Sequence, residues 1–213
     1  MEISLNSIIP DFLEKEKTDK SGIWKQNLAF KKGDKVSIVA PSGSGKTSFV
    51  HFLYGIRKDY SGELLLEKKL VKNIDATTLA AIRATQLSIV FQDLRLFKDF
   101  SALQNVEIKR NLAPYHSTSL INEMAERLGV STKLSQNAGT CSYGEQQRIA
   151  IIRALQQPFD FIILDEPFSH LDEANSKKAI TLIEEEADKR GAGIILADLQ
   201  ANSFFNADST LHL

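Results

Sequence analysis

The sequence predicts an α/β fold built on a mainly parallel sheet, with an antiparallel β piece at the N-terminus and a helical insertion. Short apolar segments of strand type alternate with helix-type segments, and this alternation is typical of parallel strands joined by right-handed crossovers. Residues 36–40, VSIVA, form a continuous, mostly β-branched run of the kind found in strands buried on both faces. Residues 98–140 hold helix-type patterns and loop residues but no strand pattern, so this segment is predicted to be the helical insertion.

The remaining elements follow from local patterns. Charged residues 14–20, followed by Ser21 and Gly22, predict a hairpin loop or exposed connection after the N-terminal segment. Strands are predicted where short apolar runs occur, at 36–40, 63–66, 87–91, 161–164 and 194–197. Helices are predicted where the pattern becomes helical, at 48–56, 76–84, 119–128, 143–155 and 174–189.

Composition limits the classes of protein to which the chain can belong. The 213 residues are 43% hydrophobic and 25% charged, the profile of one or at most two compact domains. We expect a single domain over residues 1–213, with a helical subdomain at about 98–145. A net charge of -1 provides no overall field for nucleic acid, so we expect no such partner. Cys141 is the only cysteine, which excludes an intramolecular disulfide and fits a reducing cytoplasm.

Neither end of the sequence nor its interior predicts a membrane segment. The short apolar stretch before Pro10 has no basic region ahead of it and is followed by Asp11, so we expect no signal peptide and no export. The longest purely apolar runs, such as 161–164, cover only a few residues, whereas a membrane-spanning helix needs about 20. The chain is therefore predicted not to cross a membrane by itself.

The most informative motif is APSGSGKT at residues 40–47, between a predicted strand and a predicted helix. Gly43 and Gly45 let backbone N–H groups turn toward a phosphate, and the helix N-terminus adds positive potential. Lys46 is expected to reach the β and γ phosphates, and Thr47 offers a hydroxyl to Mg²⁺. The motif is that of a P-loop NTPase with Ala in place of Gly at its first position. The predicted nucleotide-binding residues are Ala40, Pro41, Ser42, Gly43, Ser44, Gly45, Lys46, Thr47 and Ser48.

A second motif, FIILDEP at residues 161–167, places two carboxylates at the end of an apolar strand. Asp165 is expected at the carboxyl end of the strand, where it can hold Mg²⁺ through water. Glu166 can polarise a water for attack on the γ-phosphate. Two charges at a buried strand end cost free energy unless a cation or hydrogen-bond donors meet them. The pair therefore predicts a catalytic site that combines Glu166 with Lys46.

Together with these motifs, three further segments make the chain resemble the nucleotide-binding domain of an ABC ATPase. They are Gln92 in SIVFQD, SYGEQQR at 142–148 and SHLD at 169–172, and the set keeps the family's order over nearly the whole chain. The stretch FQDLRLFKDFSALQNV also resembles the compact subgroup of lipoprotein-release, macrolide-export and cell-division ATPases. The resemblance implies an ATP-binding and hydrolysing subunit, with ATP and Mg²⁺ as cofactors, that powers a separate integral membrane permease-type subunit. Such a subunit is peripheral at the inner face of the cell membrane.

The resemblance also implies roles for single residues. Gln92 is expected to contact Mg²⁺ or the attacking water and to relay the nucleotide state to the membrane partner. Ser142 and Gly144 are expected to contact the γ-phosphate of ATP held by a second subunit, so ATP should drive formation of a homodimer or a heterodimer. Phe12 is the first candidate for an aromatic residue that stacks on adenine, and Trp24 is the second.

The signature segment departs from the family pattern. Cys141, Tyr143 and Glu145 stand where the family usually has Leu, Gly and Gln. Tyr143 adds bulk where a backbone is expected to approach phosphate closely, and Glu145 adds negative charge near that anion. These changes predict a weaker signature contact.

The segment after the last strand lacks the family's switch histidine. Either Ala197 or Asp198 takes that position, depending on the alignment, so we expect slow hydrolysis. This departure leaves an alternative open, in which the chain is a weakly hydrolysing, ATP-gated regulatory module or the degenerate half of a heterodimer. Glu166 favours the hydrolysing subunit.

Overall fold

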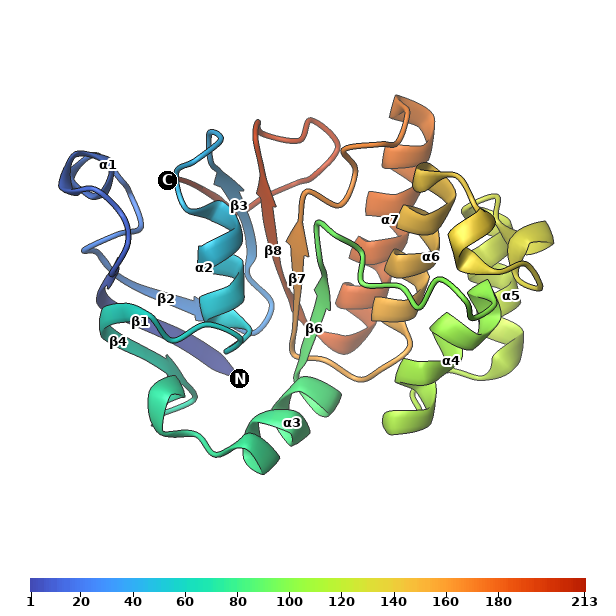
Figure 1. Ribbon diagram of the computed structural model, residues 1–213, viewed down its shortest axis with the longest axis horizontal. Coiled ribbons are helices and arrows are strands. Elements are labelled where there is room, and N and C mark those ends of the chain that lie inside the picture. Colours follow the sequence, from blue (N-terminus) through green and yellow to red (C-terminus); the bar gives the residue numbers. More distant parts are fainter.

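A five-stranded parallel sheet forms the centre of the computed structural model, which describes residues 1–213 (Figure 1). The strand order is β6-β7-β8-β3-β9, and every neighbouring pair runs parallel, which confirms the predicted mainly parallel sheet. The strands are β3 (Lys35–Val39), β6 (Leu87–Val90), β7 (Phe161–Asp165), β8 (Gly193–Asp198) and β9 (Ser209–His212). The sequence analysis did not predict β9, because this short edge strand is mostly polar and exposed.

A second sheet is antiparallel, as predicted for the N-terminal piece. Its order is β2-β1-β4-β5, and its strands are β1 (Glu2–Pro10), β2 (Asn27–Lys31), β4 (Tyr60–Leu66) and β5 (Lys69–Leu70). The strand expected at 63–66 lies here within β4. Leu64 and Leu66 are buried with an accessible residue between them, the alternation of a sheet with one covered face.

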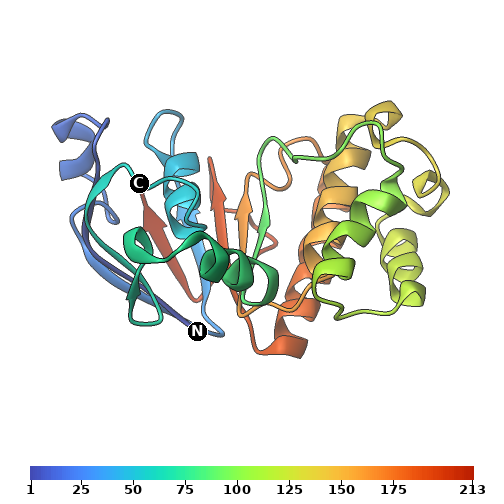
Figure 2. The same ribbon diagram turned by 60° about the horizontal axis from the view of Figure 1, so that its bottom comes forward.

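Seven α-helices lie beside and between the two sheets (Figure 2). They are α1 (Lys15–Asp19), α2 (Lys46–Leu53), α3 (Ala76–Thr85), α4 (Ala102–Leu112), α5 (Thr118–Arg127), α6 (Tyr143–Leu155) and α7 (Glu173–Arg190), with single 3₁₀ turns at Val71–Asn73, Ser131–Lys133 and Ala138–Thr140. Helix α1 occupies most of the charged segment expected to be a connection. Helices α4 and α5 lie in the segment predicted to be the helical insertion. None of the helices combines the length and the apolar character that crossing a membrane requires.

Both faces of the parallel sheet are buried, which explains the continuous apolar runs of its strands. In β7, Ile162 and Leu164 pack with α6 and α7 in one hydrophobic cluster. Phe161 and Ile163 point the other way and pack with α2 and the antiparallel sheet in a second cluster. Successive side chains of a strand alternate between faces, so the central strands contribute to both cores and hold the loops at their ends in fixed positions.

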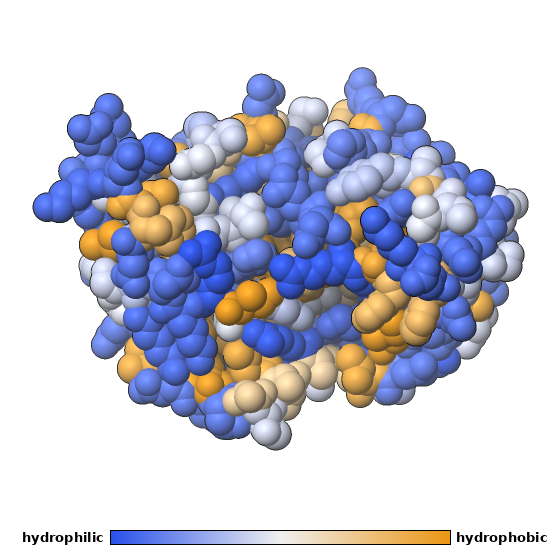
Figure 3. Space-filling model, in the orientation of Figure 1, coloured by the Kyte–Doolittle hydropathy of each residue, from blue (hydrophilic) through white to orange (hydrophobic).

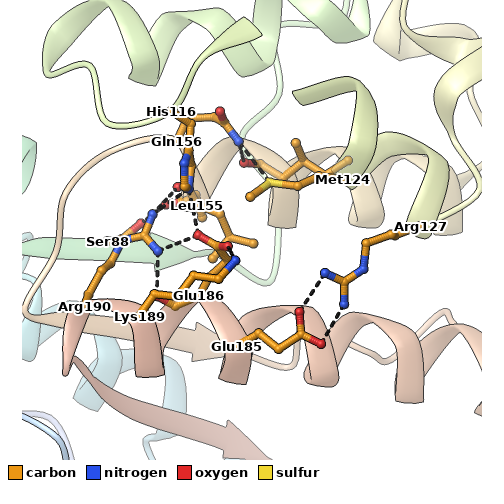
Figure 4. A network of polar contacts seen from close by, with 12 residues as sticks. Ser88, His116, Met124, Arg127, Leu155, Gln156, Glu185, Glu186, Lys189 and Arg190 are labelled. Atoms are coloured by element: carbon orange, nitrogen blue, oxygen red, sulfur yellow. Dashed lines mark hydrogen bonds and ion pairs between the residues drawn. The ribbon is translucent and has the colours of Figure 1, made fainter. Parts of the chain in front are cut away.

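A buried polar network joins the connection between α4 and α5 to α7 (Figure 4). At its centre is the carboxylate of Glu186, which is only 1% exposed. His116 Nε2 lies 2.7 Å from Glu186 Oε2, and Arg190 Nη1 donates to the same oxygen over 2.6 Å. Lys189 Nζ donates to Glu186 Oε1 over 2.7 Å. Both carboxylate oxygens are therefore paired, and the network ties together segments 70 residues apart.

Candidate functional site

The P-loop, Gln92 and the two carboxylates Asp165 and Glu166 all lie at carboxyl ends of parallel strands. They follow or end β3, β6 and β7, and this edge of an α/β sheet is where ligands bind. A pocket of about 380 Å³ opens there, lined by the P-loop with Phe12, Gln92 and Glu166. Most of the face shown in Figure 3 is hydrophilic, with apolar groups in separate small patches.

Two glycines give the P-loop its shape. Gly43 has φ 78° and Gly45 has φ 98°, left-handed conformations that L side chains rarely adopt. Gly45 also lies so close to Trp24 that an added Cβ would meet the indole ring at 3.2 Å. Ala40, by contrast, does not have a positive φ, so the first position of the motif does not require glycine in this chain.

Trp24 supports the P-loop from inside the protein. Its side chain is fully buried, and Nε1 donates to the Ser44 carbonyl over 3.3 Å. The ring therefore lies beneath the loop and does not face the pocket, which removes Trp24 as a candidate for stacking on adenine.

Phe12 has the exposure that a nucleobase platform needs. The residue is 48% exposed and lines the pocket. The guanidinium of Arg57 lies 4.4 Å from the ring centroid and donates from Nη1 to Ser48 Oγ over 2.8 Å. Arg57 thereby connects Phe12 to the helix that follows the P-loop. The sequence analysis missed Arg57, because no motif surrounds it.

Lys46 is the cation that lines the pocket; its side chain is 6% exposed and forms an ion pair with Glu166. Burial lowers the pKa of Lys46, and the nearby carboxylates of Asp165 and Asp198 oppose that shift. Glu166 has φ 45°, an uncommon conformation for a residue with a side chain. One cation thus lies among three carboxylates.

Asp165 fits the chemistry of a divalent cation site. The residue is 1% exposed, and neither of its carboxylate oxygens has a hydrogen-bond partner. Burial raises its pKa, while the charge of Lys46 and the nearby Thr47 hydroxyl act in the opposite direction. Near this site, Thr47 Oγ1 donates to Gln92 Oε1 over 3.3 Å. Carboxylate, hydroxyl and amide oxygens are ligands that Mg²⁺ accepts, so the residues fit this ion.

The signature residues lie outside this pocket, at the start of α6. Ser142 caps the helix: its Oγ accepts from the backbone N–H of Glu145 over 3.3 Å, and the Glu145 carboxylate accepts from the Ser142 N–H over 2.7 Å. The acidic side chain of Glu145 is therefore part of a capping box. Gly144 is required within its own chain, because an added Cβ would lie 2.9 Å from the His170 carbonyl oxygen.

The two candidates for the missing histidine position differ in environment. Ala197 is fully buried in the core, whereas Asp198 ends β8 and is only partly buried. Asp198 Oδ1 accepts from the Leu199 N–H over 2.7 Å. Burial raises the pKa of Asp198, and the Lys46 charge opposes this shift. Asp198 is therefore the candidate whose side chain interacts electrostatically with the P-loop lysine.

Comparison with known proteins shows the family to which the chain is similar. Residues 24–169 match the family model described as ABC transporter. The chain is 32% identical over 184 residues to the lipoprotein-releasing system ATP-binding protein LolD of Syntrophotalea carbinolica, covering 85% of this chain and 81% of that protein. It is 30% identical to LolD of Buchnera aphidicola, covering 91% of this chain and 89% of that protein.

Solved structures give the same result for the fold. The dimeric bacterial ABC transporter cassette MJ0796 superposes with a TM-score of 0.83 at 24% identity, covering 99% of this chain and 94% of that one. Its dimeric post-hydrolysis state, bound to ADP and Pi, superposes with a TM-score of 0.79 at 25% identity, covering 93% of this chain and 88% of that one.

Proposed function

The chain belongs to the ABC transporter family, in which it is an ATP-binding and hydrolysing subunit, and we propose that the carboxyl edge of its parallel sheet carries out both steps. The observation that carries the assignment of residues is Asp165, a buried carboxylate without a hydrogen-bond partner at the strand end next to the P-loop. Such a group is costly to bury unless a ligand matches it. A metal–nucleotide complex supplies that match.

The P-loop residues bind the phosphates, with their backbone N–H groups and Lys46 as donors. Asp165, Thr47 and Gln92 would hold Mg²⁺, which would supply positive charge against the phosphates. Phosphate competes with Glu166 for Lys46, so ATP binding releases the Glu166 carboxylate from its ion pair. The released carboxylate accepts a proton from the attacking water.

The adenine base stacks on Phe12, which is exposed and also contacts the Arg57 guanidinium. Ser142 and Gly144 act on ATP held by a second copy or a related subunit, because neither lines the pocket of its own chain. The dimeric form of the similar cassette supports this arrangement.

We further propose that the chain works at the inner face of the membrane through an integral membrane subunit. Relatives at 30 to 32% identity are lipoprotein-releasing system ATP-binding proteins, which supports lipoprotein release as the process that this chain drives.

The assignment is tested first by ATP binding. Lys46→Ala should weaken ATP affinity in calorimetry by about 100-fold, the loss of about 3 kcal/mol expected when a cation facing phosphate is removed. Lys177→Ala, on the exposed face of α7, is the matched control and should bind ATP as the parent does. Equal affinity of the Lys46 variant and the parent would refute the assignment of the pocket.

The rate of ATP hydrolysis tests the assignment of Glu166 as the general base. Glu166→Gln keeps the shape of the side chain but removes the proton acceptor, so kcat should fall by about 10² to 10⁴-fold while ATP still binds. The variant should accumulate as an ATP-bound dimer in size-exclusion chromatography. A purely monomeric elution with ATP would contradict the homodimer and direct the search to a heterodimeric partner.

The second candidate function, a weakly hydrolysing regulatory module, is favoured by the missing histidine. One lost donor to a transition state costs about 10²-fold or more in rate. If Asp198 occupies the histidine's place, Asp198→His should increase the single-turnover rate and leave ATP affinity nearly unchanged. If Ala197 occupies it, Ala197→His should give the gain instead. No gain in either variant would show that the histidine is not what limits the rate.

A further inference from the structure

Tyr143, the residue that departs most from the signature pattern, contacts two loops of its own chain. Its hydroxyl donates to the backbone carbonyl of Gln92 over 3.1 Å. Its ring lies edge-on to the His170 imidazole, with centroids 4.3 Å apart and an interplanar angle of 63°. One side chain at the start of α6 therefore holds the loop after β6 and the loop after β7.

The contact with His170 continues to Glu166 through Gln147, which is 1% exposed. Gln147 Oε1 accepts from the His170 N–H over 3.2 Å, and Gln147 Nε2 donates to the Glu166 carbonyl over 3.1 Å. The same amide nitrogen lies 3.4 Å from Ser169 Oγ. A continuous path of contacts thus runs from the Gln92 backbone to the Glu166 backbone.

The geometry at both ends of this path needs support. Glu166 has φ 45°, and a residue held in this region costs about 1 to 3 kcal/mol unless its surroundings determine the conformation. Gln92 contacts Thr47 through its side chain, while its carbonyl is held by Tyr143. A glycine at position 143, the family residue, has no side chain to reach either loop.

We propose that Tyr143 is a positioning residue for ATP hydrolysis. It fixes the loop that contains Gln92 relative to the loop that leads from Glu166 to His170. The side chains of Gln92 and Glu166 can then reach the attacking water at the same time. The inference rests on the proposed function, because it requires Glu166 to be the base. It also reverses the expectation from the sequence, in which Tyr143 only obstructs the approach to phosphate.

The test measures kcat and KM for ATP in single-residue variants of the full chain. Tyr143→Phe keeps the ring and loses the hydroxyl, so kcat should fall about fivefold, the factor that one hydrogen bond contributes, with KM unchanged. Tyr143→Gly loses both contacts and should be slower still. Tyr115→Phe is the matched control, because Tyr115 has the same exposure of 43% and packs against Arg190, away from the pocket; its kcat should equal that of the parent.

A double-mutant cycle separates positioning from a local structural effect. If Tyr143 joins the two loops, its hydroxyl matters only while His170 holds the ring, so Tyr143→Phe should change kcat less than twofold in a His170→Ala background. Independent, multiplying effects would overturn the proposal. Thermal unfolding of all variants checks that they fold. Because Tyr143 is half-exposed, substituting it should change the unfolding midpoint little.

The remaining outcomes are decisive as well. An unchanged kcat in Tyr143→Phe, or a Tyr143→Gly variant faster than the parent, overturns the positioning role. If Glu166→Gln is at the same time inactive as an ATPase, the proposed function still stands. A Glu166→Gln variant that hydrolyses ATP at the parent rate refutes the assigned base, and with it this inference.

Discussion

Two carboxylates in this protein are equally buried but have opposite surroundings. Asp165, at the edge of the parallel sheet, and Glu186, on α7, are each 1% exposed. Both oxygens of Glu186 are paired with cations or the His116 ring (Figure 4), whereas neither oxygen of Asp165 has a hydrogen-bond partner. We therefore expect the Glu186 carboxylate to stabilise the fold and the Asp165 carboxylate to destabilise it.

The pKa values of the two groups move in opposite directions for this reason. Burial alone would raise the pKa of Glu186, but hydrogen bonds from His116, Lys189 and Arg190 outweigh it and lower the pKa below its ordinary value. Burial raises the pKa of Asp165, and the charge of Lys46 together with the nearby Thr47 hydroxyl only partly opposes this shift. Unmatched buried charge is retained where a ligand uses it.

The largest effect is expected at Glu186. Glu186→Gln removes the charge at the centre of the network and leaves Arg190, which is 3% exposed, without its counter-ion. Breaking a buried pair in this way should lower the free energy of unfolding by about 3 to 5 kcal/mol. Urea denaturation measures the loss, and a decrease below 1 kcal/mol would mean that the network does not stabilise the fold.

The same residue should control part of the acid sensitivity. Because the pKa of Glu186 is lowered from 4.5 in the folded protein, its contribution is fully present above about pH 4.5 and is lost as the pH falls toward the folded-state pKa. The stability difference between parent and Glu186→Gln should therefore shrink on acidification below that pH. A difference that stays constant from neutral to acidic pH argues against the ionised network.

At the edge of the parallel sheet, replacing a buried carboxylate should change the free energy of unfolding in the opposite direction. Asp165→Asn removes an unmatched buried charge, so the free energy of unfolding without ligand should rise by about 1 kcal/mol. The same variant should lose most of the stabilisation that Mg²⁺ and ATP give the parent in thermal unfolding. Destabilisation of the ligand-free variant would show that Asp165 supports the fold and would remove the contrast with Glu186.

The smallest effect is expected from an exposed ion pair between α5 and α7. Arg127 Nη1 lies 2.7 Å from Glu185 Oε2, and the two side chains are 43% and 42% exposed. Arg127→Ala should cost about 0.2 to 1 kcal/mol, less at high salt, since water screens the pair. Urea denaturation at low and high salt measures this loss. A cost comparable to that of Glu186→Gln would show that burial does not set the strength of these ion pairs.

Local motifs made much of this protein predictable. The P-loop and the DE pair depend on residues adjacent in the chain, and helix α6 begins and ends at the predicted residues 143 and 155. The sequence analysis did not predict α4 as a separate helix within the insertion, although Ser101 and Gln104 form the capping box that marks its start. The short strand β9 has a polar sequence and is defined by pairing with β3, so no local pattern identified it.

The sequence by itself determined the parallel fold, the family and the residues expected to handle phosphate, because those depend on backbone conformation and apolar periodicity over a few neighbouring positions. Only the tertiary structure decided which contacts surround them. Three contacts join segments far apart in the chain: Arg57 lies over the Phe12 ring, Trp24 lies under the P-loop, and Tyr143 lies between Gln92 and His170. Such contacts arise from the packing of whole elements, and no spacing of residues within one segment encodes them.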